Sequence, residues 1–248
     1  MFDMEYNMRT IFLKRFLSRC FYVNTVALGL AAIKELATDF SLQADKVPDE
    51  ETYQTARDVF IAMGANLKDH PLQLISQTYT KANVHANLIT GAYCLGYFRR
   101  AYDEFQRANH SNLSRQEFER AMYAHESVHA MERHDLLNSY ISLICALTMT
   151  RVVCSFQLHF AVVCAISSVS YFSTSRYVSR RLEYRADRLA ATTIPGVRNN
   201  LITILSTPDH HNRYLFGLFD GHPSKFERRK ALEEFNSLEE TATGPENN

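Results

Sequence analysis

The amino-acid sequence predicts a mostly helical α+β fold with an apolar helical hairpin inserted into it. Three observations support this prediction. Helix start signals occur at Ser114 and Ser224, short apolar segments punctuated by glycine and proline occur over residues 71–98, and residues 136–172 are apolar for most of their length. The length of 248 residues suits one domain, or one domain with a membrane element.

Charge and cysteine content argue against nucleic-acid binding, a disulfide framework and a cysteine-based metal site. The 27 basic and 27 acidic residues cancel and neither sign forms a long block, so the basic footprint of a nucleic-acid-binding protein is missing. The five cysteines contain no CxxC pair and lie in apolar surroundings, which indicates reduced core thiols rather than a disulfide framework or a cysteine-based metal site. We therefore expect no nucleic acid among the partners.

Residues 1–44 are predicted to form a basic and apolar amino-terminal segment. Within residues 9–33, basic side chains precede an apolar run of about 14 residues, which is short of the roughly 17 to 25 that a membrane span needs. We interpret the segment as an amphipathic helix that lies on a membrane or packs on the domain. A signal peptide is the alternative, although Asp3 and Glu5 precede the basic residues and no A-x-A site follows.

The main domain is expected over residues 45–235. It begins with a polar helix through Ala62, after which "PLQLISQTY" is a strand candidate and "HANLITGAYCLGYF" a second strand or a hairpin. Ser114 and Glu117 have the spacing of a capping box, so a long helix should start at Ser114.

The apolar hairpin over residues 136–172 is predicted to consist of two helices joined near Arg151. The second helix, residues 152–172, is long enough to cross a bilayer, whereas the first is long enough only if it starts near His134. A buried hairpin in a soluble protein is the alternative, because short apolar runs do not distinguish the two.

Basic residues flank the hairpin unevenly. Arg133 lies before it, Arg176, Arg180 and Arg181 lie after it, and Arg151 is at its far turn. Because basic residues favour the cytoplasmic side of a membrane, this distribution predicts a membrane protein whose outer hairpin ends and catalytic face are cytoplasmic.

The chain after the hairpin is predicted to hold two more helices. The first contains "RRLEYRADRLAA", and the second, "KFERRKALEEF", starts at a capping box formed by Ser224 and Glu227. The polar residues 236–248 are expected to form a disordered tail.

The segment "HESVH" carries the clearest chemical signal. His125 and His129 are spaced i, i+4, so one face of a helix would present both imidazoles to a single ion. Glu126 would lie beside that ion, where a carboxylate can take a proton from an activated water. His134 is set aside as a ligand, because nine further residues of helix would place it on the opposite face.

Glu183 is the best candidate for the third ligand that a catalytic zinc site needs. Asp187 follows it at i+4, so the same helix could present Glu183 to the ion and Asp187 to the far nitrogen of a ligating histidine. The alternative is an exposed acidic pair among neighbouring arginines.

Three signatures, "HESVH", "EYRAD" and "GHPSKFERR", occur in the order seen in the HtpX-like membrane zinc metallopeptidases, the family that also includes the CAAX prenyl endopeptidases. The chain resembles this family over roughly residues 55–235. The resemblance implies a zincin-type metallopeptidase domain, with the hairpin inserted between the HExxH helix and the helix of the third ligand.

The resemblance also implies the roles of the site residues. His125, His129 and Glu183 would bind Zn²⁺, Glu126 would be the general base, and Asp187 would hydrogen-bond a ligating histidine.

His222 and Arg228, six residues apart as in the family's third signature, would lie near the oxyanion that forms on the scissile carbonyl. Alternatively, His222 is a turn residue before a capped helix, and Arg228 is a surface partner of Glu227 or Glu234.

The resulting hypothesis is a membrane-associated, zinc-dependent metalloendopeptidase that acts on protein or peptide substrates. The alternative is a catalytically silent, membrane-anchored binding or scaffold protein with the same fold.

Overall fold

A computed structural model of the chain describes most residues after position 49. The described residues are 50–75, 84–86, 92–96, 99–109, 111–156, 160–207 and 222–242. The predicted amino-terminal segment 1–44 lies outside them. Among the described residues, those between Asn138 and Ser175 form one compact unit, which we call the α5–α6 unit, and the others form the main unit.

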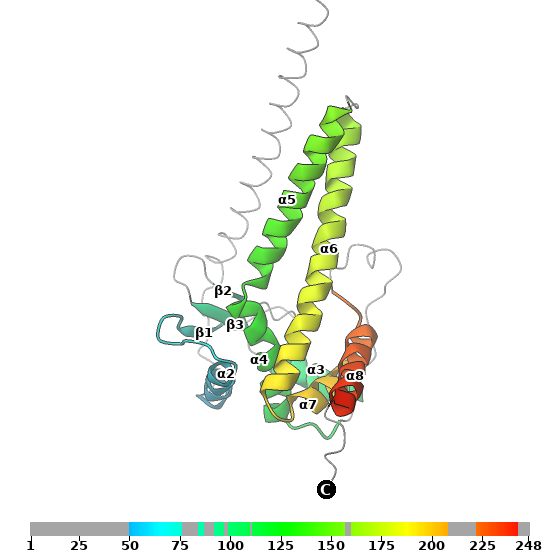
Figure 1. Ribbon diagram of the computed structural model, residues 1–248. Helices are drawn as coiled ribbons and strands as arrows, with labels where there is room; N and C mark the ends of the chain where they lie inside the picture. The colour runs from blue at the N-terminus through cyan, green and yellow to red at the C-terminus, as the bar shows by residue number, and fades with distance from the viewer. Residues whose placement is uncertain are drawn as a thin grey trace, which may run out of the picture. The chain divides into compact units, whose positions relative to one another are not determined.

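The described part of the chain is mostly helical, as predicted, and contains one small sheet (Figure 1). Its elements are α2 (Glu50–Ala62), β1 (Leu72–Ile75), β2 (Val84–Ala86), β3 (Tyr93–Gly96), α3 (Arg99–Asn109), α4 (Arg115–Met131), α5 (His134–Ser155), α6 (Phe160–Thr193), α7 (Val197–Leu205) and α8 (Lys225–Ala242).

The sheet of the main unit has the order β1-β3-β2. Strands β1 and β3 are parallel. Strands β2 and β3 are antiparallel, with Val84 opposite Leu95. The two predicted strand segments are therefore confirmed, and the second contains a pair of antiparallel strands.

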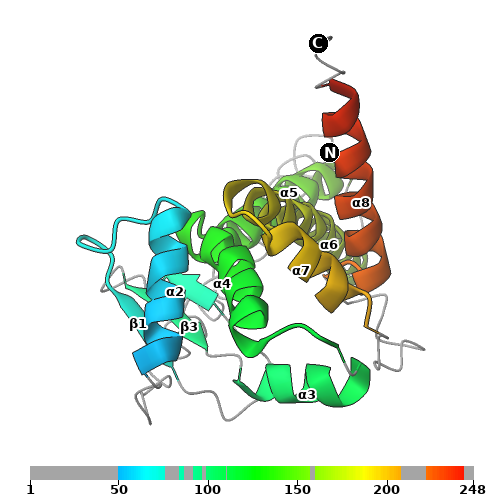
Figure 2. The same ribbon diagram turned by 90° about the horizontal axis from the view of Figure 1, so that it is seen from below.

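Helix α4 is the central element of the main unit. It contacts α2, α3, α7 and both β2 and β3 (Figure 2). Small buried residues on α4, such as Ala121 and Ala124, allow these neighbours to approach closely, and the fully buried Tyr123 belongs to the same hydrophobic core as Phe60 of α2. Each large apolar side chain buried here stabilises the fold by about 1.5 to 3 kcal/mol. This core holds the helix that carries the HExxH motif.

Capping boxes start α4 and α8, as predicted. The backbone N–H of Glu117 donates to the Ser114 hydroxyl at 3.2 Å, and the backbone N–H of Ser114 donates to the Glu117 carboxylate at 2.9 Å. Ser224 and Glu227 repeat both bonds at 3.1 and 2.8 Å. These bonds satisfy backbone donors that a helix start otherwise leaves unpaired.

Helix α4 ends before His134, although His134 was expected to lie on the same continuous helix as His125. The last residue of α4 is Met131, and Arg133 has a φ of 50°, a left-handed conformation that non-glycine residues rarely adopt. The chain turns there and α5 begins at His134. This turn decides where the side chain of His134 lies.

We expect Arg133→Gly to be more stable than Arg133→Ala by about 1 kcal/mol, because glycine adopts the left-handed conformation without a Cβ clash. The two variants remove the same guanidinium, so their difference reports the backbone conformation. The free energy of unfolding from denaturant titration measures it, and equal stabilities would contradict the left-handed turn.

The α5–α6 unit consists of two helical segments that hydrogen-bond to one another (Figure 1). The amide of Asn138 donates to the Ser175 hydroxyl at 3.1 Å, and the hydroxyls of Thr150 and Ser167 lie 2.6 Å apart. The prediction that the helices join near Arg151 is wrong, because Arg151 lies inside α5. Residues 136–172 contain no glycine or proline, so nothing breaks the helix at that arginine.

The two helices predicted after residue 152 are one helix. α6 runs without interruption through Thr193, so it includes both the apolar residues and "RRLEYRADRLAA". In the described part of the chain, the helix long and apolar enough to cross a membrane is α5, over Leu136–Val153, with a mean hydropathy of 1.5. The span was predicted in the second helix, over residues 152–172. The structure differs because α5 continues through Ser155, so residues 152–155 belong to the first helix.

Helix α8 continues through Ala242, so the prediction of a disordered tail is wrong for residues 236–242. This stretch, "NSLEETA", contains the helix formers leucine, glutamate and alanine, which favour continuation of the helix. Residues 243–248 lie outside the described part of the chain.

Candidate metal centre

Three of the predicted ligands come together in the main unit. His125 and His129 project from one face of α4, and Glu183 projects from α6. The two Nε2 atoms lie 3.1 Å apart, and the Glu183 oxygens lie 3.4 Å from Nε2 of His125 and 3.5 Å from Nε2 of His129. The alternative of an exposed acidic pair is wrong, since Glu183 is 5% exposed.

The spacing of these donors fits a metal ion. Ligands 2.0 to 2.1 Å from one ion at tetrahedral angles lie about 3.3 to 3.4 Å from each other. The two Nε2 atoms lie 3.1 Å apart, and each lies 3.4 or 3.5 Å from one of the two Glu183 oxygens, Oε2 for His125 and Oε1 for His129, so the contacts are close to this value. Two imidazoles and one carboxylate are also the donor set of many catalytic zinc sites. The residues could therefore hold a metal ion with a position left for water.

Asp187 contacts the far nitrogen of His125. Its Oδ1 lies 2.9 Å from Nδ1 of His125, the position predicted from the i, i+4 spacing. Arg228 of α8 holds the same carboxylate through two bonds of 2.7 and 2.6 Å. Burial alone would raise the pKa of Asp187, but Arg228 and His125 lower it to about 2. Asp187 is therefore ionised and accepts a hydrogen bond from the Nδ1–H group of His125, which leaves Nε2 of His125 facing the site.

Glu183 is held in place by two further groups. Nη1 of Arg228 lies 3.1 Å from Oε2, and Nδ1 of His222 lies 2.9 Å from Oε1. Burial opposes the charge, yet hydrogen bonds from His125 and His222 hold the pKa of Glu183 well below its usual range. The carboxylate is thus ionised and available to a cation.

His125 and His129 differ in pKa when no metal ion is bound. Burial and Arg228 oppose a charge on His125, but Asp187 and Glu183 outweigh them and raise its pKa to about 10. Burial and the charge on His125 lower the pKa of His129 to about 3. A metal ion bound to Nε2 of His125 would have to displace the second proton of this imidazole.

Glu126 and His222 are both reached by solvent. Glu126 is half-buried on α4; burial opposes the charge of Arg228, but Asp187, Glu183 and Glu126 raise the pKa of Arg228. The side chain of His222 is 67% exposed while contacting Glu183. Both could therefore meet a substrate beside the three ligand atoms.

Arg228 is not the surface partner of Glu227 or Glu234. Its side chain is 17% exposed and contacts Asp187 and Glu183, whereas Glu227 pairs with Arg180 at 2.6 Å. That alternative is wrong, because α8 turns Arg228 toward α6.

Sequence reasoning misplaced His134. The early end of α4 brings its Nδ1 within 2.8 Å of Nδ1 of His129, instead of onto the opposite face. Its Nε2 lies 2.8 Å from Glu132, which Arg185 of α6 binds through two nitrogens at 2.6 and 2.7 Å. No breaker occurs in "HAMERHD", so the sequence carries no signal for this turn.

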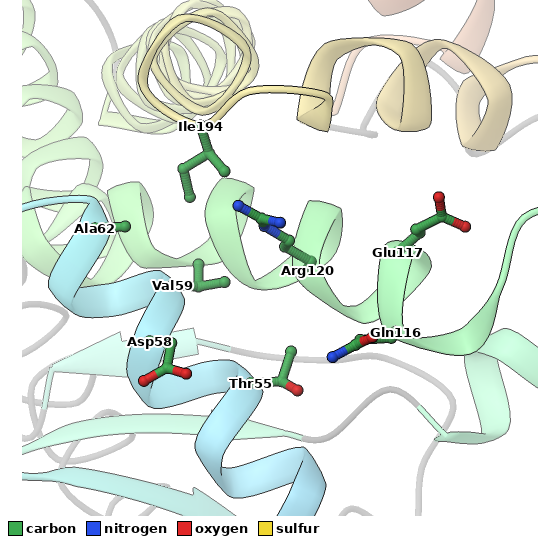
Figure 3. Close-up of a pocket in the computed structure, with 8 residues that line it drawn as sticks. All are labelled: Thr55, Asp58, Val59, Ala62, Gln116, Glu117, Arg120 and Ile194. Atoms are coloured by element: carbon green, nitrogen blue, oxygen red, sulfur yellow. The ribbon is translucent and has the colours of Figure 1, made fainter.

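A cavity of about 320 Å³ lies elsewhere in the main unit, between α2 and the first turns of α4 (Figure 3). Thr55, Asp58, Gln116 and Arg120 contribute polar groups to its wall. The residues that line it do not include His125, His129 or Glu183.

Comparison with known proteins agrees with the site geometry. Searches of curated proteins and of solved structures found no match. The family model for peptidase family M48 matches residues 73–236, a range that includes all three signatures and every predicted site residue. The resemblance to the HtpX-like metallopeptidases is therefore confirmed: the chain belongs to peptidase family M48, whose members are metal-dependent peptidases.

Proposed function

We propose that the protein is a zinc-dependent metalloendopeptidase that hydrolyses protein or peptide substrates. The observation that carries this proposal is the convergence of two imidazole nitrogens, 3.1 Å apart, with one carboxylate, whose Oε2 lies 3.4 Å from His125 and whose Oε1 lies 3.5 Å from His129. The M48 family match supports the peptidase class.

In the proposed mechanism, His125, His129 and Glu183 bind zinc through Nε2 atoms and a carboxylate oxygen. A bound zinc ion would lower the pKa of water toward 7 and polarise the scissile carbonyl. Glu126 takes the proton of the attacking water and then delivers it to the leaving amine.

We further propose that His222 and Arg228 stabilise the oxyanion. Each carries a nitrogen within hydrogen-bonding distance of Glu183, so each lies beside the ligand set. His222 is the more exposed and is better able to contact substrate directly, whereas Arg228 also orients Asp187.

Membrane association is proposed on the apolar surface of α5 and α6. The span Leu136–Val153 has suitable length and composition, and large apolar side chains on both helices are exposed. They include Tyr140, Ile144, Met149 and Val152 on α5, and Val162, Val169 and Phe172 on α6. The proposed organisation is a peptidase domain over residues 45–235 with an inserted membrane hairpin, and the flanking arginines favour a cytoplasmic catalytic face.

The test is zinc binding to the purified full-length protein as a function of pH. We expect one zinc ion per chain and an affinity that rises about tenfold per pH unit between pH 7 and 9. The sign follows from His125, whose pKa of about 10 keeps the imidazole protonated in the metal-free protein, so zinc must displace that proton. Chelator competition measures the affinity. An absence of zinc binding would overturn the proposed ligand set, whereas a pH-independent affinity would contradict the raised pKa of His125.

Casein cleavage by the same preparation tests the enzymatic part of the proposal. Removal of zinc with a chelator is expected to stop cleavage, and added zinc is expected to restore it. A protein that binds one zinc ion without cleaving casein or itself would instead be a catalytically silent relative.

A further inference from the structure

We infer that His134, Glu132 and Arg185 form a relay that orients His129 and fixes its tautomer, so that Nε2 of His129 presents its lone pair to the metal. This inference rests on the proposed function, because it assigns these residues a role in metal binding. His134 is a positioning residue in this relay, since it acts through His129 and does not meet the ion.

Hydrogen-bonding contacts connect the exposed Arg185 to His129 without a gap. Nε and Nη2 of Arg185 bind the two oxygens of Glu132 at 2.6 and 2.7 Å. Glu132 lies 2.8 Å from Nε2 of His134, and Nδ1 of His134 lies 2.8 Å from Nδ1 of His129. His134 itself is 2% exposed, so its ring is held by its surroundings.

The direction of each hydrogen bond follows from the charged end of the relay. Hydrogen bonds from Arg185 and His134 lower the pKa of Glu132 to about 2, so this carboxylate only accepts. Nε2 of His134 must therefore donate, and in the inferred relay Nδ1 of His134 is the acceptor. His129 then donates from Nδ1, and its unprotonated Nε2 faces His125 and Glu183.

His125 is supported in a parallel way by Asp187 and Arg228. On both sides of the site, an arginine holds a carboxylate through two bonds, and that carboxylate determines which nitrogen of a ligating histidine carries the proton. The difference is that His134 is interposed on the side of His129. The left-handed turn at Arg133 makes this possible, because it directs His134 back toward α4.

The experiment measures zinc affinity of full-length variants by chelator competition, together with histidine tautomers by long-range ¹⁵N NMR. His134→Leu removes the acceptor and is expected to weaken zinc binding 10- to 100-fold, the usual effect of losing a partner of a ligating histidine. His134→Asn offers an amide oxygen near the position of Nδ1, so it is expected to recover most of the affinity. In the wild type, Nδ1 of His129 should carry the proton.

Two arginine variants on α6 test the outer end of the relay: Arg185→Ala removes a member of the relay, and Arg181→Ala is its matched control. Arg185→Ala is expected to weaken zinc binding a few-fold, which is less than His134→Leu because the Arg185 side chain is 58% exposed and water can replace it. Arg181→Ala removes an exposed arginine one turn earlier on the same helix, where its contact is Tyr177, and should leave the affinity unchanged.

The outcomes separate this inference from the proposed function. A wild type that binds no zinc overturns the proposed function itself. If the wild type binds zinc and His134→Leu binds it equally well, the relay is overturned while the ligand set stands. Equal losses in His134→Leu and His134→Asn would also overturn the relay, because they would reflect packing instead of the acceptor at Nδ1.

Discussion

Glu126→Gln is expected to abolish peptide cleavage while leaving zinc binding intact. The amide cannot take a proton from water, and loss of a general base lowers the rate on the order of 10² to 10⁴-fold. Glu126 is not one of the three converging donors, so the substitution leaves the metal ligands in place. Casein cleavage and zinc content, measured on the same preparation, separate the two effects.

The matched control is Glu51→Gln, which makes the same chemical change at an exposed position on α2. It should retain both activity and zinc. An active Glu126→Gln enzyme would end the assignment of Glu126 as the base, and loss of zinc in that variant would assign the residue to the ligand set instead.

Glu183→Ala is expected to lose the metal ion and, with it, activity. Two imidazoles would remain, and the carboxylate charge that also holds His222 and Arg228 would be gone. Because Glu183 is a direct ligand in the proposed site, the loss of affinity should exceed the roughly 10- to 100-fold expected for a residue that only supports a ligand. Metal analysis after purification, followed by chelator competition, measures the effect.

Glu183→Gln separates the contribution of the negative charge to zinc affinity from that of side-chain volume. The amide keeps the volume and one oxygen donor but removes the negative charge, so its zinc affinity should lie between those of the wild type and Glu183→Ala. Unchanged zinc content in Glu183→Ala would mean that the third ligand lies elsewhere, even if His125 and His129 both bind.

Local sequence patterns predicted the parts of the fold that depend on neighbouring residues. The capping boxes at Ser114 and Ser224 placed the starts of α4 and α8 correctly, because both partners lie within one helical turn. The i, i+4 spacing of His125 and His129 likewise places both imidazoles on one face of any helix that contains them. The contact of Asp187 with His125 followed from the same spacing on α6.

Helix ends without a glycine or proline were the main source of error. The join after Ser155 was placed at Arg151, and the turn at Arg133 was not foreseen. A charged residue does not by itself end a helix, and a left-handed non-glycine residue is favoured only by contacts elsewhere. The position of His134 depended on this turn, so extrapolating the helix placed it on the wrong face.

The sequence by itself determined the chemical groups available to this protein: a pair of histidines spaced so that both can face one ion, a glutamate directly after the first, a separate acidic pair, and a long apolar segment between them. Tertiary structure alone decided that Glu183 meets the histidines, that Arg228 holds Asp187, and that His134 contacts His129. The reason is physical. Spacing within one helix follows from its constant geometry, whereas contacts between residues distant in the chain depend on how the helices pack and where each one ends.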